Sequence, residues 1–300
     1  MKTFVALGEC MVELAAAEGG LWQMGIAGDT LNTAWYARAL LPEGWGVAYA
    51  TVIGRDAFSE RVPPFLAGAG IATDRVARHG SRAIGLYAIS VTGGERSFSY
   101  WRDSSAARTL ADDPARLARL IDGADLLHVS GITLAILPAE GRRTLFAAIS
   151  TAREAGTRVS FDPNIRPKLW ESAGAARAAI AEMAGLADIA LPSFDDEAAL
   201  FGDADTAATL ARYAEAGAET VVVKDGGAAI EALHAGERLR LDGLARAVPV
   251  DTTGAGDSFN GALLAEVVAG RAIGPAVRRA HEVASRVVGH RGALMPFGTF

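Results

Sequence analysis

The sequence predicts an α/β fold in which a mostly parallel sheet is covered on both faces by helices. From about residue 122 onward, short apolar stretches alternate with alanine-rich amphipathic stretches, the β-α-β-α order that is typical of this class. The expected strands are apolar throughout, as strands buried on both faces are. With 300 residues, of which 50% are hydrophobic and 21% charged, the chain is long enough to bury a large core.

The N-terminal part contributes the first strand, the first helix and a separate small sheet. Residues 1–9 predict a short strand, and a glycine turn at Gly28 leads into a helix to about Leu40. Residues 84–101 alternate around Gly93-Gly94, which predicts a hairpin. This hairpin lies apart from the main rhythm, so we expect a small sheet that forms a lid or an edge for dimerisation. Its segments, approximately 12–27 and 83–103, would be inserted in a single domain spanning 1–300.

The second half supplies the remaining parallel strands. We expect strands at 126–130, 158–162, 189–191 and 220–224, and helices at 139–155, 173–185 and 205–216. Ligands in such sheets lie beyond the C-terminal strand ends. Asp162, Lys224 and a glycine-rich run, Asp251-Thr252-Thr253-Gly254-Ala255-Gly256-Asp257-Ser258-Phe259, fall at such places.

The glycine-rich run is the strongest functional signal. Gly254 and Gly256 allow backbone N–H groups to converge at the start of a helix expected over 258–268, where an anionic phosphoryl group would be stabilised. Asp257 at the rim of this anion hole suits a base that takes a proton from an attacking hydroxyl. The alternative is a glycine loop with an ordinary acidic helix cap. A Walker-type phosphate loop and a dinucleotide fingerprint are excluded by the spacing.

Bulk properties exclude several other classes of protein. The net charge of −6 argues against nucleic-acid binding. The single cysteine, Cys10, excludes an internal disulfide framework and suits a reducing cytosol. No apolar run approaches the roughly 20 residues of a membrane span, and the histidines lack metal-ligand spacing. We therefore expect a soluble cytoplasmic protein.

Four further segments carry candidate binding residues, each with a plainer alternative. Asp29 and Asn32 share one face of a helix start and could bind sugar hydroxyls, or Asp29 could simply cap the helix. Asn164 and Arg166 follow a buried strand, where Arg166 could neutralise an anion or remain solvated. Two more segments could each bind a ligand or be plain structural features. They are Tyr100-Trp101-Arg102 at the end of the lid, with Tyr87 on the paired strand, and the glycine loop Lys224-Asp225-Gly226-Gly227-Ala228.

Together these segments resemble the ribokinase-like (PfkB) carbohydrate kinases along nearly the whole chain. The C-terminal signature of that family is similar to residues 251–259, and its N-terminal signature to Ala27-Gly28-Asp29-Thr30-Leu31-Asn32 with Ile53-Gly54-Arg55-Asp56 downstream. The chain looks most like the 2-keto-3-deoxygluconate kinases of the family. Segments that carry this finer likeness include Gly8-Glu9-Cys10-Met11-Val12-Glu13-Leu14, Ser130-Gly131-Ile132-Thr133-Leu134 and Asp162-Pro163-Asn164-Ile165-Arg166.

The resemblance implies an αβα sandwich with a β-lid, ATP and Mg²⁺, and a set of site residues. Asp257 would be the base and Gly254, Ala255 and Gly256 the anion hole. The sugar would contact Gly28, Asp29, Thr30, Leu31, Asn32, Tyr87, Tyr100, Trp101, Arg102 and Arg166. The nucleotide would contact Asn164, Ile165, Arg166, Lys224, Asp225, Gly226, Gly227, Ala228 and Ala229. The family pattern associated with magnesium reads Ser193-Phe194-Asp195-Asp196-Glu197 here, so no direct metal ligand is assigned.

The expected reaction is transfer of the ATP γ-phosphoryl group to 2-keto-3-deoxygluconate, giving the 6-phosphate. This sugar acid carries a carboxylate that Arg102 and Arg166 could bind. The alternatives are a fructokinase or another ketose kinase of the same family, and a sugar-binding sensor without catalysis. The sequence favours a homo-oligomer through the lid strands, and leaves open whether a monovalent cation binds near Asp251.

Overall fold

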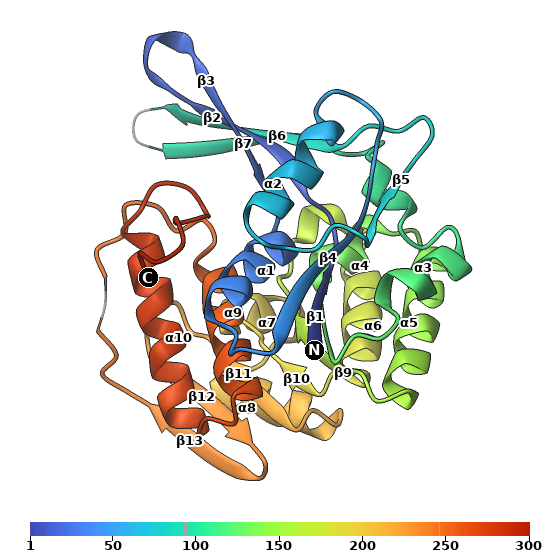
Figure 1. Cartoon of the computed structure of the whole chain (residues 1–300). Coiled ribbons are helices and arrows are strands. Elements are labelled where there is room, and N and C mark those ends of the chain that lie inside the picture. The colour runs from blue at the N-terminus through green and yellow to red at the C-terminus, as the bar shows by residue number, and fades with distance from the viewer. Residues whose placement is uncertain (93–94, 246) are drawn as a thin grey trace.

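A nine-stranded sheet forms the centre of the molecule. The computed structural model describes residues 1–92, 95–245 and 247–300, and within them the strand order is β13-β12-β11-β10-β9-β8-β1-β4-β5 (Figure 1). Pairing is parallel from β11 to β5 and antiparallel at β12 and β13. The strands are β1 Lys2–Leu7, β4 Trp45–Ile53, β5 Val76–Arg78, β8 Leu126–Ser130, β9 Arg158–Asp162, β10 Ile189–Ala190, β11 Thr220–Val223, β12 Ile230–His234 and β13 Glu237–Leu241. The predicted mostly parallel sheet is confirmed.

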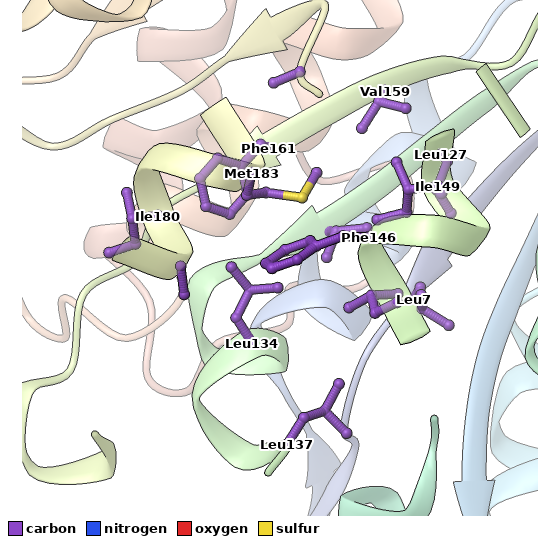
Figure 2. Packing of buried hydrophobic residues seen from close by; sticks show 14 of the residues in the cluster. Leu7, Leu127, Leu134, Leu137, Phe146, Ile149, Val159, Phe161, Ile180 and Met183 are labelled. Atoms are coloured by element: carbon purple, nitrogen blue, oxygen red, sulfur yellow. The ribbon is translucent and has the colours of Figure 1, made fainter. Parts of the chain in front are cut away.

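Two hydrophobic cores lie on opposite faces of this sheet. Side chains alternate along a strand, so Phe4 and Ala6 of β1 join one core while Val5 and Leu7 join the other. The first core packs against α1 Asp29–Leu40, α2 Val62–Gly68, α9 Ala255–Val268 and α10 Ile273–Val288. The second, shown in Figure 2, packs against α3 Pro114–Ile121, α4 Gly131–Ile136, α5 Ala139–Glu154, α6 Ala173–Ala184, α7 Phe194–Phe201 and α8 Thr206–Glu215. The result is a three-layer αβα sandwich.

A smaller sheet projects from one end of the sandwich and forms the lid (Figure 1). Its order is β3-β2-β6-β7, from β2 Met11–Ala16, β3 Trp22–Ala27, β6 Gly85–Thr92 and β7 Glu95–Trp101. The antiparallel pair β6–β7 is the predicted hairpin, whereas the predicted turn at Gly93-Gly94 lies outside the described residues. Tyr87, Phe98 and Tyr100 share one face of this sheet because they are in register across β6 and β7.

Strand β1 marks the topological switch point of the main sheet. Strand β4 pairs with one side of β1 and β8 with the other, so connections diverge there and leave a crevice at the C-terminal strand ends. Helix α9 starts at Ala255, three residues before the predicted start. Its first turn therefore contains Asp257, whose carboxylate is held at the crevice by a helix. Within the described residues, no helix combines the length and apolar character that a bilayer span needs.

Candidate active site

A cavity of about 1020 Å³ occupies the crevice between the strand ends and the lid. Asp257 and the turn Gly254 to Gly256 line it from α9, Asp29 and Asn32 from α1, and Lys224 from the end of β11. Predicted site residues from distant parts of the chain thus meet in one cavity. The other predicted residues that line it are Gly28, Tyr87, Tyr100, Arg102, Asn164 and Arg166.

The remaining predicted residues lie elsewhere in the described structure. Thr30 and Leu31 are fully buried and do not line the cavity. Trp101 is 62% exposed and, next to Tyr100 on a strand, faces away from the cavity. Ile165 is buried in the second core, and Asp225, Gly226, Gly227, Ala228 and Ala229 form the β11–β12 connection, outside the cavity lining.

Asp257 is oriented by α1. Asn32 Nδ2 donates a hydrogen bond to Asp257 Oδ2 at 2.7 Å, and Gly28 N donates to Asn32 Oδ1 at 3.4 Å. Burial, and then the nearby Asp29 carboxylate, raise the pKa of Asp257 to about 8. A carboxyl group with a pKa near neutrality is suited to accept a proton from a hydroxyl and release it again.

The turn before Asp257 strongly favours glycine at its first position. Gly254 has φ of +76°, and a Cβ there would stand 2.9 Å from the carbonyl oxygen of Ala293. The N–H groups at the start of a helix lack intrahelical acceptors, although Ala255 N donates to the carbonyl of Thr252 at 3.2 Å. The turn from Gly254 to Gly256 lines the cavity together with Asp257, and its role as an anion hole stays a prediction.

A second carboxylate, Asp29, is fixed from the loop after β9. Asn164 Nδ2 donates to Asp29 Oδ2 at 3.0 Å, and Asn164 N donates to Asp162 Oδ1 at 3.1 Å. Asn164 has φ of +34°, a left-handed conformation that is uncommon outside glycine and is often found at functional sites. Burial raises the pKa of Asp29 above its ordinary value. Ionising Asp29 and Asp257 together is therefore unfavourable in this cavity.

The two predicted carboxylate-binding arginines differ in environment. Arg102 is 6% exposed and forms an ion pair with the buried Glu9. Arg166 is half-exposed, and its Nη1 lies 3.6 Å from Asp196 Oδ2. Both arginines line the cavity, but Glu9 balances the charge of Arg102 much more closely than the more exposed Asp196 balances that of Arg166.

Several cavity residues were not among the predicted site residues: Glu9, Met11, Phe98, Asp162, Ser193, Asp196, Thr252 and Thr253. Asp162 had a sequence signal, its place at the end of an apolar strand. Glu9 lay in a segment that carries the family likeness, but its pairing with Arg102, 93 residues away, has no local sequence signal. Among the described residues, no group of three or more His, Cys, Asp or Glu side chains is arranged to hold a metal ion by itself.

Comparisons with known proteins agree with this geometry. The sequence profile of the pfkB family carbohydrate kinases matches residues 1–297. A 2-dehydro-3-deoxygluconokinase of Dickeya dadantii (strain 3937) is 37% identical over 303 residues, covering 98% of this chain and 97% of its own.

Two solved structures share the fold. A PfkB protein from Polaromonas sp. JS666 superimposes with a TM-score of 0.82 at 27% identity, over 98% of this chain and 97% of its own. A putative ribokinase II from E. coli, solved in complex with ATP and Mg²⁺, superimposes with a TM-score of 0.84 at 24% identity, over 97% and 94%. The chain belongs to the pfkB family of carbohydrate kinases.

Proposed function

We propose that this kinase transfers the γ-phosphoryl group of ATP to the 6-hydroxyl of 2-keto-3-deoxygluconate. The observation that carries the proposal is the meeting, in one cavity, of an acid beside an anion hole with two arginines. The acid and the anion hole suit phosphoryl transfer to a hydroxyl. The two arginines suit a substrate that carries a carboxylate. The 2-dehydro-3-deoxygluconokinase relative, similar over nearly its whole length, supports the same substrate.

In the proposed reaction, Asp257 accepts the proton of the attacking hydroxyl while the new O–P bond forms and ADP leaves. Asn32 keeps the carboxylate directed at the hydroxyl through its 2.7 Å hydrogen bond. The N–H groups of the turn from Gly254 to Gly256 stabilise the charge on the transferring phosphoryl oxygens. The lid, which contributes Tyr87 and Tyr100 to the cavity wall, limits access of water that would otherwise hydrolyse ATP.

Arg102 and Arg166 recognise the substrate carboxylate. Glu9 binds one terminal nitrogen of Arg102 and so fixes the guanidinium plane, leaving its other donors for the ligand. Arg166 also lines the cavity and exchanges its exposed contact with Asp196 for the substrate. Charge-assisted bonds of this kind are worth about 1.5–3 kcal/mol each, which distinguishes a sugar acid from a neutral ketose. Asp29, Gly28 and Asn32 bind its hydroxyls.

The nucleotide lies against the loop after β9 and the β11–β12 connection, with Asn164, Ile165, Lys224 and residues 225–229 in contact. Mg²⁺ accompanies ATP, and oxygen donors suit it. Asp196 lines the cavity and is the carboxylate that would hold it together with the phosphates, where it would supply charge neutralisation. A cytoplasmic setting belongs to the same proposal, because ATP is the donor and Cys10 is a buried free thiol.

We also infer that the chain works as one domain spanning 1–300, with the lid inserted in it, and that lids pair between two copies. Phe98 and Tyr100 are 43% and 54% exposed on the lid, and such aromatic surface is typical of a contact region. Phe98→Glu should convert a dimer to a monomer in light scattering. A wild-type monomer at micromolar concentration would contradict lid pairing.

The test is sugar-dependent ADP release with ATP and Mg²⁺, comparing 2-keto-3-deoxygluconate with fructose, ribose and adenosine. We expect strong preference for the sugar acid. Arg166→Ala should lower kcat/KM for the acid roughly 10- to 100-fold and leave any activity on fructose nearly unchanged. Arg143→Ala, on the exposed surface of α5, is the control. Preference for fructose would replace the substrate with a neutral ketose, and no turnover with intact sugar binding would indicate a sensor.

A further inference from the structure

Lys224 is held at the cavity by both its backbone and its side chain. Its N–H donates to the carbonyl of Pro192 at 2.9 Å, and its carbonyl accepts from the N–H of Phe194 at 2.8 Å. The backbone of Lys224 therefore extends strand β11 and is held in place by hydrogen bonds. Its side chain is only 12% exposed, which is unusual for a lysine.

The ammonium group belongs to a closed triangle of buried polar groups. Lys224 Nζ lies 3.1 Å from Asn260 Oδ1 and 3.3 Å from Asp162 Oδ2, and Asn260 Nδ2 donates to the same carboxylate oxygen at 2.5 Å. Asp162 and Asn260 are 4% and 1% exposed. These contacts occupy two of the three ammonium protons, so the triangle fixes the position of the charge and leaves a donor for a further acceptor.

The charge is fixed beside the anion hole. The position that a Cβ of Gly256 would take lies 3.9 Å from Lys224 Nζ, which places the ammonium alongside the first turn of α9. The two arginines of the cavity, Arg102 and Arg166, pair with Glu9 and Asp196, and the proposed function assigns them to the substrate carboxylate. Lys224 is thus a buried cation beside the N–H groups that would receive the transferring phosphoryl group.

We propose that Lys224 is a catalytic residue that contacts the transferring phosphoryl group, and that Asp162 and Asn260 are positioning residues for its ammonium. The inference rests on the proposed kinase function and goes beyond ground-state ATP binding. The hydroxyl oxygen attacks the γ-phosphorus, its proton passes to Asp257, and the bond to the bridging oxygen of ADP breaks. Lys224 stays protonated throughout and donates a hydrogen bond to a non-bridging oxygen of the γ-phosphoryl group. This hydrogen bond strengthens as the phosphoryl group transfers.

Steady-state kinetics of Lys224→Met separate this role from simple nucleotide binding. Loss of a donor that acts in the transition state lowers kcat by about 10²–10³-fold with little change in the KM for ATP. A raised KM for ATP with a wild-type kcat would overturn the proposal. Calorimetric ATP binding is expected to stay near wild type, whereas the melting temperature should fall because the buried Asp162 loses its ion partner. Retained cooperative unfolding and ATP binding show that the variant is folded.

Chemical rescue provides a sharper test. Lys224→Cys, alkylated with 2-bromoethylamine, restores an ammonium at nearly the original distance, and we expect recovery of at least a tenth of the lost kcat. The reaction is selective because the sole native cysteine, Cys10, is buried with its pKa raised to about 12. Wild-type enzyme treated in the same way is the control. A folded, fully alkylated variant that stays inactive would contradict a catalytic role.

The positioning residues are tested through coupling to the lysine. Asn260→Ala should lower kcat at least tenfold in the wild-type background and change it little in the Lys224→Met background. Additive losses in the double variant would overturn the positioning role. All assays use whichever sugar the wild-type enzyme phosphorylates best, so a wrong substrate assignment leaves this result readable, and a wild type without kinase activity refutes the proposed function instead.

Discussion

Asp257 combines a catalytic position with a cost to the stability of the free protein. Its pKa is raised from 3.8 to about 8 by burial and by Asp29, so the folded protein holds a proton that the unfolded chain has already released. The carboxyl group therefore favours folding below about pH 4 and loses this contribution as the pH rises toward 8. The group that we propose as the base of the reaction is therefore most stable in the fold when it is protonated.

We expect Asp257→Asn to remove most turnover, at least 10²-fold in kcat, and to raise the melting temperature by roughly 2–4 °C at pH 8.5. The gain should shrink at pH 5.5, where the folded protein keeps the Asp257 carboxyl protonated and so avoids most of the cost of a buried negative charge. Thermal denaturation followed by circular dichroism at the two pH values measures it. A gain that is independent of pH would show that the carboxyl group is not the cause.

The same pKa predicts the pH dependence of activity. The base acts only when deprotonated, so kcat/KM should rise as the pH increases through about 8 and level off above it. Initial rates of ADP release between pH 5.5 and 9.5 at saturating Mg²⁺ test this. A plateau that already begins near pH 5 would mean that the carboxyl group titrates normally in the working enzyme.

At the scale of elements, one ion pair joins the lid to the sandwich. Glu9 lies between β1 and β2, and Arg102 directly follows β7, so the pair connects two places where the chain passes between the main sheet and the lid. Both side chains are buried, and breaking a buried pair by changing one partner costs about 3–5 kcal/mol. The lid orientation is thus coupled to Arg102, the arginine that we propose binds the substrate.

Glu9→Gln should therefore loosen the lid as well as lower stability. We expect a several-fold higher ratio of ATP hydrolysis without sugar to sugar phosphorylation, because water enters a poorly closed cavity. Glu13→Gln, on the same lid but hydrogen-bonded to Tyr87 within the lid sheet, is the comparison. An unchanged ratio in the Glu9 variant would show that Glu9 contributes to stability but not to closure of the lid.

The segment after α10 supports the anion hole from behind. Tyr36 Oη donates to the carbonyl of Ala293 at 2.7 Å, and Gly292 N donates to Asp251 Oδ2 at 2.7 Å. Ala293 in turn packs directly against Gly254. The C-terminal segment, α1 and the turn before α9 therefore form one unit.

Gly254→Ala tests this unit. Its strained φ costs about 1–3 kcal/mol, and the clash with Ala293 adds to the loss of stability and displaces the anion hole, so kcat falls as well. Gly270→Ala is the matched control, since Gly270 has a similar φ of +73° with no atom within 4 Å of its Cβ position. Equal losses in urea unfolding would show that contact with Ala293 contributes nothing.

For the whole molecule, local signals were enough for the sheet and for much of the site. Apolar runs located β8, β9 and β11, and the glycine run located Asp257. The start of α9 was missed because Gly254 in a left-handed conformation caps it, where sequence rules expect a polar side chain. The Glu9–Arg102 pair and the Asp162–Asn260 contact join residues 93 and 98 positions apart, which no local pattern encodes.

The link between Asn32 and Asp257 spans 225 positions, and its consequence appears during synthesis. A chain emerging from the ribosome can begin to assemble β1, β4 and β8 well before residues 254–257, the proposed anion hole and base, have been made. Ala293, which packs against Gly254, follows later still. Translation therefore orders the two events: these strands are available first, and chains that stall before residue 254 lack the complete site.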